Sequence, residues 1–376
     1  MKIRAAVLDR MDAEPPYAAS KPLHVQTIDL DPPGRGELLV RIVAAGLCHS
    51  DLSVINGVRP RPMPMALGHE SAGIVESLGE DVTDLAVGDH VVMVFMPSCG
   101  QCLPCAEGRP ALCEPGAAAN GAGTLLSGFR RLHRNGADVN HHLGVSGFAE
   151  FAVVSRRSVV KVDKDLPLDE AALFGCAVLT GVGAVVNTGQ LRPGQSAAVI
   201  GLGGVGLASV LGAIACGAPR VVAIDLADDK LRLARELGAS HTVNARDPDA
   251  AEQVKKVTGG GVDFAFEMAG SARAMELAWK ITRRGGTTIT AGLPPPTAAL
   301  AVPLVQLVAE ERTLKGSYIG TCVPTRDIPR YVALYRAGRL PVDRLMSAKL
   351  KIDDINEAFD LLHEAKAVRQ VIEFAS

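Results

Sequence analysis

The first third of the sequence carries short apolar runs separated by proline and glycine, a pattern typical of a β-rich domain. Residues 38–43 and 91–94 are β-branched runs that predict strands, with turn residues such as those at 31–34 between them. Strand character returns over residues 148–154. The intervening residues 114–147 are rich in Gly, Ala, Asn and His and poor in strand signals, so we expect a long surface excursion there.

From about residue 178 the apolar runs become separated by helical patterns. Strands are predicted at 197–200, 221–224, 264–266 and 287–290, and a helix at 228–237. This alternation predicts βαβ units and a parallel sheet. An amphipathic helix near 355–363 and a strand near 368–374 close the chain. We therefore predict an α/β protein with a β-rich domain at 1–177 and 321–376 around a doubly wound domain at 178–320.

Composition and charge narrow the class of protein. A chain of 376 residues is long enough for two domains, and its 39 glycines and 23 prolines suit a turn-rich globular protein. The formal net charge of −2 offers no general attraction for nucleic acid or acidic membranes. No signal peptide or long apolar span is evident, so we expect a cytoplasmic protein with reduced thiols, no membrane partner and no nucleic-acid partner.

Four cysteines in one short run predict a structural zinc site. The segment CGQCLPCAEGRPALC has C-x2-C-x2-C-x7-C spacing, and four thiolates can fill a tetrahedral zinc at about 2.3 Å per bond. Such a site is coordinatively full, so it shapes a loop and does no chemistry. The four residues are Cys99, Cys102, Cys105 and Cys113.

A sparser set, Cys48, His69 and Cys176, predicts a second zinc with a catalytic role. Two thiolates and one imidazole leave one tetrahedral position open for a water or substrate. Zinc with two thiolates is formally neutral and can stabilise an alkoxide, whereas the four-cysteine site is formally −2. Only the open site is suited to catalysis.

A glycine-rich turn directly after the strand at 197–200 predicts a dinucleotide site. In G-x-G-x-x-G the first glycine permits the turn, the second admits a pyrophosphate and the third lets helix pack on strand. Asp225, at the end of the next strand, is placed to accept from ribose hydroxyls and to repel a 2′-phosphate, which favours NAD over NADP. Lys230 is within reach of the same ribose. The turn residues assigned to the cofactor are Gly201, Gly203, Gly204, Val205 and Gly206.

Together these segments resemble the zinc-containing medium-chain alcohol dehydrogenases. The resemblance is carried by GLCHSDLSVINGV, ALGHESAGIVESLG, the four-cysteine loop, HHLGVSGFAEFAVV, LFGCAVLTGVGAV, AAVIGLGGVGLASV and INEAFDLL, and it covers nearly the whole chain. The excursion after Cys113 makes the chain most similar to the long-loop branch, with the animal-type and formaldehyde-dehydrogenase-type enzymes. The resemblance implies a GroES-like catalytic domain and a Rossmann NAD-binding domain.

The resemblance also implies roles for residues around the predicted catalytic zinc. Asp51 would orient His69, Glu70 would lie behind the metal, and the basic His49 and Arg369 would lie near the pyrophosphate. Ser50 is the candidate to accept the hydroxyl proton while the α-hydride passes to the nicotinamide. Matching positions predict a substrate pocket lined by Phe95, His142, Leu143, Arg59 and Leu293.

The sequence departs from its relatives at the end of the proton relay. Many relatives have a histidine five residues after the first zinc cysteine, where this chain has Ser53. Water or His49 would then complete the relay, or proton release would be slow at low pH, and we favour water. Glu114 and the residues after it supply no arginine where the glutathione-dependent branch has one, which argues against a glutathione adduct as substrate.

The expected activity is therefore zinc-dependent hydride transfer between a primary or secondary alcohol and NAD, giving an aldehyde or ketone. One alternative is a catalytically silent, zinc-stabilised NAD sensor or structural protein. Another is a relative of the zinc-free quinone reductases, which would lack Cys48, His69 and Cys176. The resemblance implies two zincs per chain and a homodimer or homotetramer.

Overall fold

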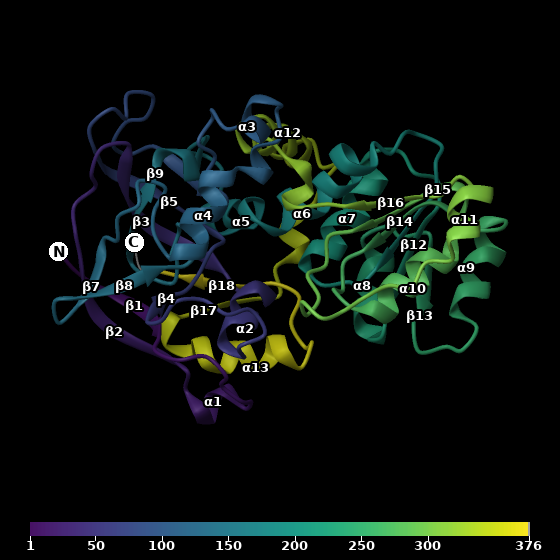
Figure 1. The fold of residues 1–376 in the computed structure, drawn as a ribbon, viewed down its shortest axis with the longest axis horizontal. Helices are drawn as coiled ribbons and strands as arrows, with labels where there is room; N and C mark the ends of the chain where they lie inside the picture. Colours follow the sequence, from purple (N-terminus) through teal and green to yellow (C-terminus); the bar gives the residue numbers. More distant parts are fainter. Residues whose placement is uncertain (375–376) are drawn as a thin grey trace. The chain divides into compact units, whose positions relative to one another are not determined.

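The computed structural model describes residues 1–374, and these divide into two compact units. The first, called here the catalytic unit, comprises residues 1–176, 323–329 and 346–374; the second, the coenzyme unit, comprises 177–322 and 330–345. The division falls within helix α12 (Pro324–Arg336). Figure 1 labels the elements of both units.

The catalytic unit is built from a small closed barrel and a larger, mostly antiparallel sheet. The barrel strands, in order, are β1 (Lys2–Leu8), β2 (Leu23–Leu30), β7 (Leu132–Arg134), β8 (Ala137–His141) and β4 (Met65–Ala66). The larger sheet runs β10 (Val159–Val162), β6 (His90–Met93), β5 (Ser71–Leu78), β3 (Glu37–Gly46), β18 (Gln370–Glu373) and β17 (Ala348–Leu350), with β9 (Phe151–Ser155) on β3. Alternate apolar residues such as Ile3, Ala5 and Val7 fill the barrel core, as expected for strands with one buried face.

Short helices connect the strands of the catalytic unit and place its predicted zinc ligands. They are α1 (Tyr17–Ser20), α2 (His49–Ile55), α3 (Leu103–Ala106), α4 (Glu114–Ala122), α5 (Leu168–Ala172) and α13 (Ile355–His363). Single 3-10 turns cover Pro110–Leu112, Arg156–Ser158, Leu173–Gly175 and Ile352–Asp354. The strands predicted at 38–43 and 91–94 and the helix at 355–363 coincide with β3, β6 and α13.

The prediction of a plain surface excursion at 114–147 was wrong. This segment contains α4 and the β7–β8 hairpin, and β7 pairs with β2 while β8 pairs with β4. The hairpin closes the barrel, and Asn140 and His141 are buried in it. The strand signal is weak because β8 (ADVNH) carries polar residues that are satisfied by hydrogen bonds, such as that from Asn140 Nδ2 to Pro64 O, rather than by apolar packing.

The coenzyme unit is a six-stranded parallel sheet with helices on both faces. Its strand order is β13 (His241–Asn244), β12 (Val221–Asp225), β11 (Ala197–Ile200), β14 (Val262–Glu267), β15 (Thr282–Thr290) and β16 (Thr313–Gly316). All five pairings are parallel. The order reverses between β11 and β14, the place where doubly wound sheets bind their ligands.

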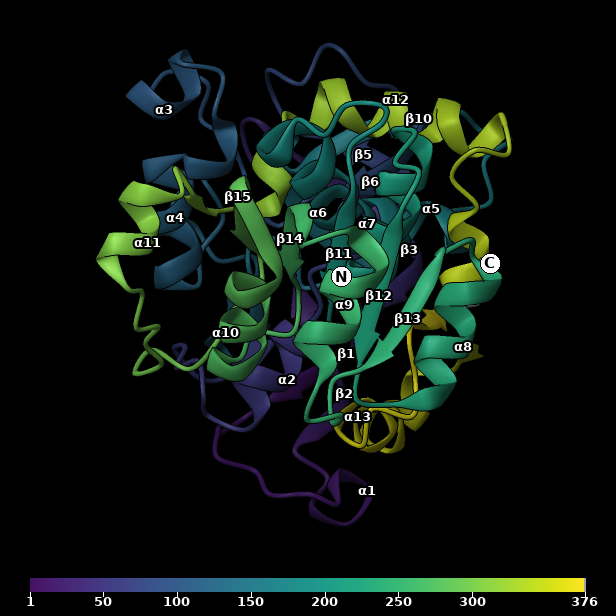
Figure 2. The ribbon, with the colours of Figure 1, turned by 90° about the vertical axis from the view of Figure 1, so that its right-hand side faces the viewer.

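Apolar side chains of this sheet point to both faces, so both are covered by helices. Ala198, Ile200, Val222 and Ile224 pack with residues of α9 (Ala250–Thr258) and α10 (Ala272–Ile281) in one core, and Figure 2 shows these two helices side by side. The other helices are α6 (Ala177–Gly183), the π-helical turn Ala184–Gly189, α7 (Gly204–Ala215), α8 (Asp228–Glu236), α11 (Leu304–Ala309) and turns at Ile319–Thr321 and Val342–Leu345. The predicted α/β class, with a β-rich domain and a doubly wound parallel domain, is confirmed.

Within residues 1–374 no single helix is long and apolar enough to cross a membrane; only the consecutive helical segments Leu168–Gly175 and Ala177–Gly189, which are bent against each other, reach that length and hydropathy together.

Candidate functional site

Three separate connections of the catalytic unit bring Cys48, His69 and Cys176 together. Cys48 precedes α2, His69 lies between β4 and β5, and Cys176 follows the 3-10 turn after α5. The side chains are nearly inaccessible, with exposed fractions of 7, 0 and 5%. Packing beside Cys48 is close, because a Cβ on Gly46 would lie 2.8 Å from a carboxylate oxygen of Glu70 and would displace that side chain.

The donor atoms of this cluster fit a tetrahedral metal ion. The sulfur atoms of Cys48 and Cys176, the imidazole of His69 and a carboxylate oxygen of Glu70 all lie within 4.8 Å of one another. The Cys176 Sγ and His69 Nε2 atoms are 3.4 Å apart. Ligands on a zinc tetrahedron with bonds of about 2.0–2.3 Å stand roughly 3.5 Å apart, so the two thiols and the imidazole match zinc in number, type and spacing.

A buried carboxylate holds the His69 ring in place. Asp51, in the first turn of α2, has no exposed side-chain surface, and its Oδ1 lies 3.1 Å from His69 Nδ1 and accepts from the Gly68 N–H at 3.1 Å. Burial opposes ionisation of Asp51, but the neighbouring His69 and His142 outweigh it and lower the pKa of the carboxyl. With Nδ1–H directed at Asp51, the Nε2 lone pair of His69 is directed at the metal position.

His142 faces the same carboxylate. Its Nδ1 lies 3.1 Å from Asp51 Oδ1, its ring meets the His69 ring edge to face at 5.5 Å, and its side chain is 1% exposed. The sequence predicts His142 as a wall of the substrate pocket and gives no sign of this contact with Asp51. Burial lowers the pKa of His142.

Glu70 and Arg369 form a buried pair beside the predicted zinc ligands. Arg369 Nη1 lies 3.3 Å from Glu70 Oε2 and donates to the Leu47 carbonyl at 2.9 Å. Burial raises the pKa of Glu70 to about 7, against the opposing effect of Arg369. Burial alone would lower the pKa of Arg369, but the Glu70 carboxylate raises it. Arg369 is 3% exposed and its guanidinium lies against Glu70. Its place near the pyrophosphate, which the resemblance implies, stays a prediction.

The four-cysteine loop gathers its sulfur atoms into a second cluster. Cys99, Cys102, Cys105 and Cys113 each place Sγ within 4.8 Å of the others, and none forms a disulfide. Backbone N–H groups point at the sulfurs: Cys102 N at Cys99 Sγ (3.3 Å), and Cys99 N and Gly116 N at Cys113 Sγ (3.1 and 3.4 Å). Hydrogen bonds of this kind, from Gln101 first and then Cys102, lower the pKa of Cys99 to about 6. Such a sulfur cluster suits a closed structural zinc site.

The glycine turn of the coenzyme unit is shaped for close approach of a phosphate. Gly201 has φ +90°, and a Cβ on Gly206 would lie 1.7 Å from Gly201 O, so neither position accepts a side chain without displacement. A Cβ on Gly203 would meet nothing within 4 Å. That open space lies at the start of α7, where the N–H groups of Gly204, Val205 and Gly206 precede the first intrahelical bonds. The turn therefore fits a dinucleotide pyrophosphate.

Asp225 lies at the end of β12, beside this turn. Its carboxylate accepts from Leu202 N–H at 2.6 Å and from Ala227 N–H at 3.0 Å, which fixes a negative charge at the carboxyl edge of the sheet. Lys230 lies on α8 and is 8% exposed, and its contact with the ribose stays a prediction.

The remaining predicted residues lie in several settings. His49 is exposed and Ser50 partly exposed in the first turn of α2, and Ser53 Oγ donates to the His49 carbonyl at 2.8 Å. Phe95 places its ring 5.3 Å from the His69 ring, edge to face, and Leu143 is buried. Arg59 is partly exposed in the catalytic unit, and Leu293 is 51% exposed in the coenzyme unit.

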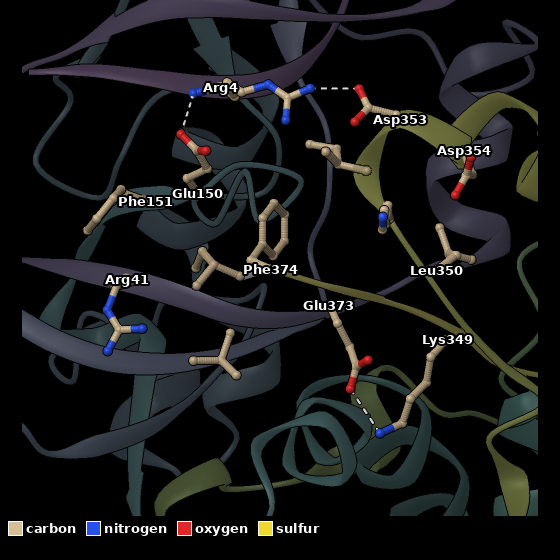
Figure 3. Close-up of a pocket in the computed structure, with 14 residues that line it drawn as sticks. Arg4, Arg41, Glu150, Phe151, Lys349, Leu350, Asp353, Asp354, Glu373 and Phe374 are labelled. Carbon is tan, nitrogen blue, oxygen red and sulfur yellow. Dashed lines mark hydrogen bonds and ion pairs between the residues drawn. The ribbon is translucent and has the colours of Figure 1, made fainter. Parts of the chain in front are cut away.

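A large cavity of the catalytic unit lies away from all of these residues. It has a volume of about 1100 Å³ and lies between β1, β3, β9, β17 and β18 (Figure 3). Two pairs of its charged lining residues are bonded to each other: Arg4 to Asp353 at 2.6 Å, and Lys349 to Glu373 at 2.9 Å. No group of metal ligands or nucleophiles converges on it, so we assign it no chemistry.

Comparisons with known proteins agree with both units. Residues 34–164 match the model of the alcohol dehydrogenase GroES-like domain, and 204–337 match the zinc-binding dehydrogenase model. An alcohol dehydrogenase zinc-binding domain protein from Burkholderia ambifaria is similar over 100% of both chains, with 33% identity and a TM-score of 0.94. Benzyl alcohol dehydrogenase from Acinetobacter calcoaceticus gives 33% identity, 100% of both chains and a TM-score of 0.93. A putative zinc-binding dehydrogenase from Sinorhizobium meliloti 1021 bound to NADP is similar over 100% of both chains, with 26% identity and a TM-score of 0.79.

Three findings indicate one family: sequence identity of 33% over the full length, two matching domain models, and a fold with both predicted units. The chain belongs to the zinc-containing medium-chain alcohol dehydrogenases, with a GroES-like catalytic domain and a Rossmann-like coenzyme domain.

Proposed function

We propose that the chain is an NAD-dependent alcohol dehydrogenase that interconverts a primary or secondary alcohol and its aldehyde or ketone. The observation that carries the proposal is the buried convergence of Cys48, His69 and Cys176, which provides three zinc donors. Zinc held by these three side chains supplies a Lewis acid that lowers the pKa of an alcohol hydroxyl. We propose a second zinc at the four-cysteine loop, giving two per chain.

Residues of this chain would hold the donors and move the proton. Asp51 fixes the His69 ring, while Glu70 and Arg369 place a compensated charge pair beside the ligands. Ser50, two residues after Cys48, can accept a proton from the substrate hydroxyl and donate its own, since a serine hydroxyl does both. The Ser53 hydroxyl donates to a backbone carbonyl, so we propose that water completes the relay.

Asp225 supports NAD as the coenzyme. Its carboxylate is fixed by two backbone N–H groups at the edge where the adenosine ribose is expected, and a 2′-phosphate placed there would meet a like charge. The NADP-bound relative from Sinorhizobium meliloti, at 26% identity, means that the family as a whole does not decide this choice.

The apolar residues beside His69 favour an alcohol with an apolar body. The Phe95 ring contacts the His69 ring, and Leu143 is buried in the same unit. The 33% identity to a benzyl alcohol dehydrogenase makes benzyl alcohol the first compound to test.

We also propose that the protein is a cytoplasmic homodimer or homotetramer. In the coenzyme unit α11 exposes Leu304, Val305 and Val308 at 75, 73 and 78%, and the edge strand β16 exposes Leu314 at 42%. Adjacent apolar groups at an unpaired strand edge are suited to pairing with a second copy of the chain.

Metal content and turnover measured together test the proposal. We expect about two zincs per chain, reduction of NAD in the presence of a primary or secondary alcohol from a panel that begins with benzyl alcohol, and much weaker turnover with NADP. Two zincs and bound NAD without turnover across the panel, in both directions, would instead indicate a sensor. Turnover of quinones without zinc would indicate a quinone reductase.

A further inference from the structure

Glu267 is a buried carboxylate beside the predicted coenzyme site. The proposed mechanism assigns no role to this residue. It is the last residue of β14, 1% exposed, and it stands in register with Ile200, the residue before the glycine turn. β11 and β14 are the two strands between which the sheet order reverses. Glu267 therefore lies at the carboxyl edge of the sheet, where doubly wound folds bind dinucleotides.

The Glu267 side chain connects two loops at this edge. Its Oε1 accepts from the N–H groups of Ala269 (2.9 Å) and Gly270 (2.6 Å) in loop 268–271. Its Oε2 accepts from Thr290 Oγ1 (2.7 Å), at the start of loop 291–293. Hydrogen bonds to a charged acceptor are among the stronger ones in proteins, and one buried carboxylate here organises both loops.

The two loops pack closely against each other and against the glycine turn. A Cβ on Gly201 would lie 2.7 Å from Ala269 N, and a Cβ on Gly292 would lie 2.2 Å from Gly270 N. Met268 N donates to Ile200 O at 2.8 Å, which ties loop 268–271 to the end of β11. A shift of either loop would therefore alter the part of the coenzyme site that follows β14 and β15.

We propose that Glu267 is a positioning residue for the nicotinamide half of the coenzyme. A dinucleotide spans the reversal point, with one mononucleotide on each side. Asp225 marks the adenosine side, on β12, while Glu267 and its loops lie on the other side, on β14 and β15. Loss of the Glu267 side chain should therefore weaken the dinucleotide and spare AMP. This inference rests on the proposed NAD-dependent function.

The same strand offers a matched control. Asp263, near the amino end of β14, accepts from Ser196 N (2.7 Å), Ser196 Oγ (2.6 Å) and Arg283 Nε (2.9 Å). It lies four residues before Glu267, about 13 Å away along the strand. Asp263→Ala removes a comparable set of hydrogen bonds at the edge of the sheet opposite to the coenzyme.

The experiment compares Glu267→Ala, Thr290→Val and Asp263→Ala with the unaltered, zinc-loaded protein. NADH affinity is measured by fluorescence titration, AMP affinity by competition, and stability by thermal unfolding. We expect Glu267→Ala to weaken NADH about tenfold and AMP less than about twofold. Thr290→Val, which keeps the shape and removes one bond, should weaken NADH by about two- to fivefold. Asp263→Ala should lower the Tm and leave both affinities unchanged.

Two results would overturn the inference: equal losses of NADH and AMP affinity in Glu267→Ala, or a loss of NADH affinity in Asp263→Ala that matches it. If Glu267→Ala does not fold, unchanged NADH affinity in Thr290→Val overturns it. Absence of NADH binding by the unaltered protein would contradict the proposed function instead, so the two failures can be told apart.

Discussion

Replacing Gly203 with alanine separates the coenzyme role of the glycine turn from its structural role. Gly203 has φ −73° and ψ −173°, a conformation open to any residue, and a Cβ there would meet nothing within 4 Å. Gly206 is the matched position in the same turn. A Cβ on Gly206 would lie 1.7 Å from Gly201 O, so alanine there must displace backbone.

The expected magnitudes follow from these contacts. Alanine at 203 restricts the unfolded chain, which stabilises by about 0.4–1 kcal/mol, and it is a poorer N-cap for α7, which costs about 0.5–1 kcal/mol. The two terms nearly cancel. Its methyl group occupies the space left for the pyrophosphate, so NADH affinity should fall at least about tenfold, or about 1.4 kcal/mol. Gly206→Ala should lower the free energy of unfolding by about 1–3 kcal/mol.

Urea unfolding and NADH titration of both variants provide the test. Gly203→Ala should unfold at the urea concentration of the unaltered protein while binding NADH weakly, and Gly206→Ala should be destabilised. The interpretation of the turn as a phosphate cradle is refuted if Gly203→Ala binds NADH normally, or if it is destabilised as much as Gly206→Ala.

Three further changes give distinct readouts. Burial lowers the pKa of His141 from its usual 6.5 to about 3, while its Nε2 accepts from the Arg131 N–H, so the unfolded chain takes up a proton first as the pH falls. The free energy of unfolding should therefore drop by about 1 kcal/mol between pH 7 and 5.5. His141→Gln, whose side chain does not titrate, should show a smaller drop when urea unfolding is measured at the two pH values. An equal drop in the variant would contradict the role of His141. Ser53→His should speed alcohol oxidation below neutral pH, because an imidazole gives the relay a final base; an unchanged pH–rate profile would refute the relay. Asp51→Asn should release zinc to a chelator about 10–100-fold faster, because His69 loses its charged partner; unchanged release would show that Asp51 does not support the metal.

Local patterns were sufficient to predict most of the fold. The strand predicted at 197–200 is β11, and the helix predicted at 228–237 is α8 within one residue, because buried β-branched runs and amphipathic periodicity act over short range. The β7–β8 hairpin was missed because its polar residues are satisfied by partners distant in sequence, such as the Pro64 carbonyl that accepts from Asn140.

In the candidate site, the sequence predicted which residue types take part but not how all of them are arranged. Ligand types identified Cys48, His69 and Cys176, since few other roles need thiol and imidazole groups together. The contact of His142 with Asp51 and the burial of Arg369 against Glu70 depend on tertiary packing across 91 and 299 residues of separation, for which the sequence has no local signal. Glu267 carries no motif, and only its burial and its hydrogen bonds in the folded chain distinguish it from a surface glutamate.

The pairing of β18 with β3 has a consequence for biosynthesis. Val371, Ile372 and Glu373 pair with the end of β3, two residues before Cys48, and Arg369 lies against Glu70. These residues are synthesised after the entire coenzyme unit, which ends at residue 345. Until then residues 44–46 of β3 lack the β18 partner, and Glu70 lacks the guanidinium that lies against it. The Glu70–Arg369 pair beside the predicted zinc ligands therefore forms only after residue 369 has been synthesised, and a chain truncated before β18 leaves this part of the β3 edge unpaired.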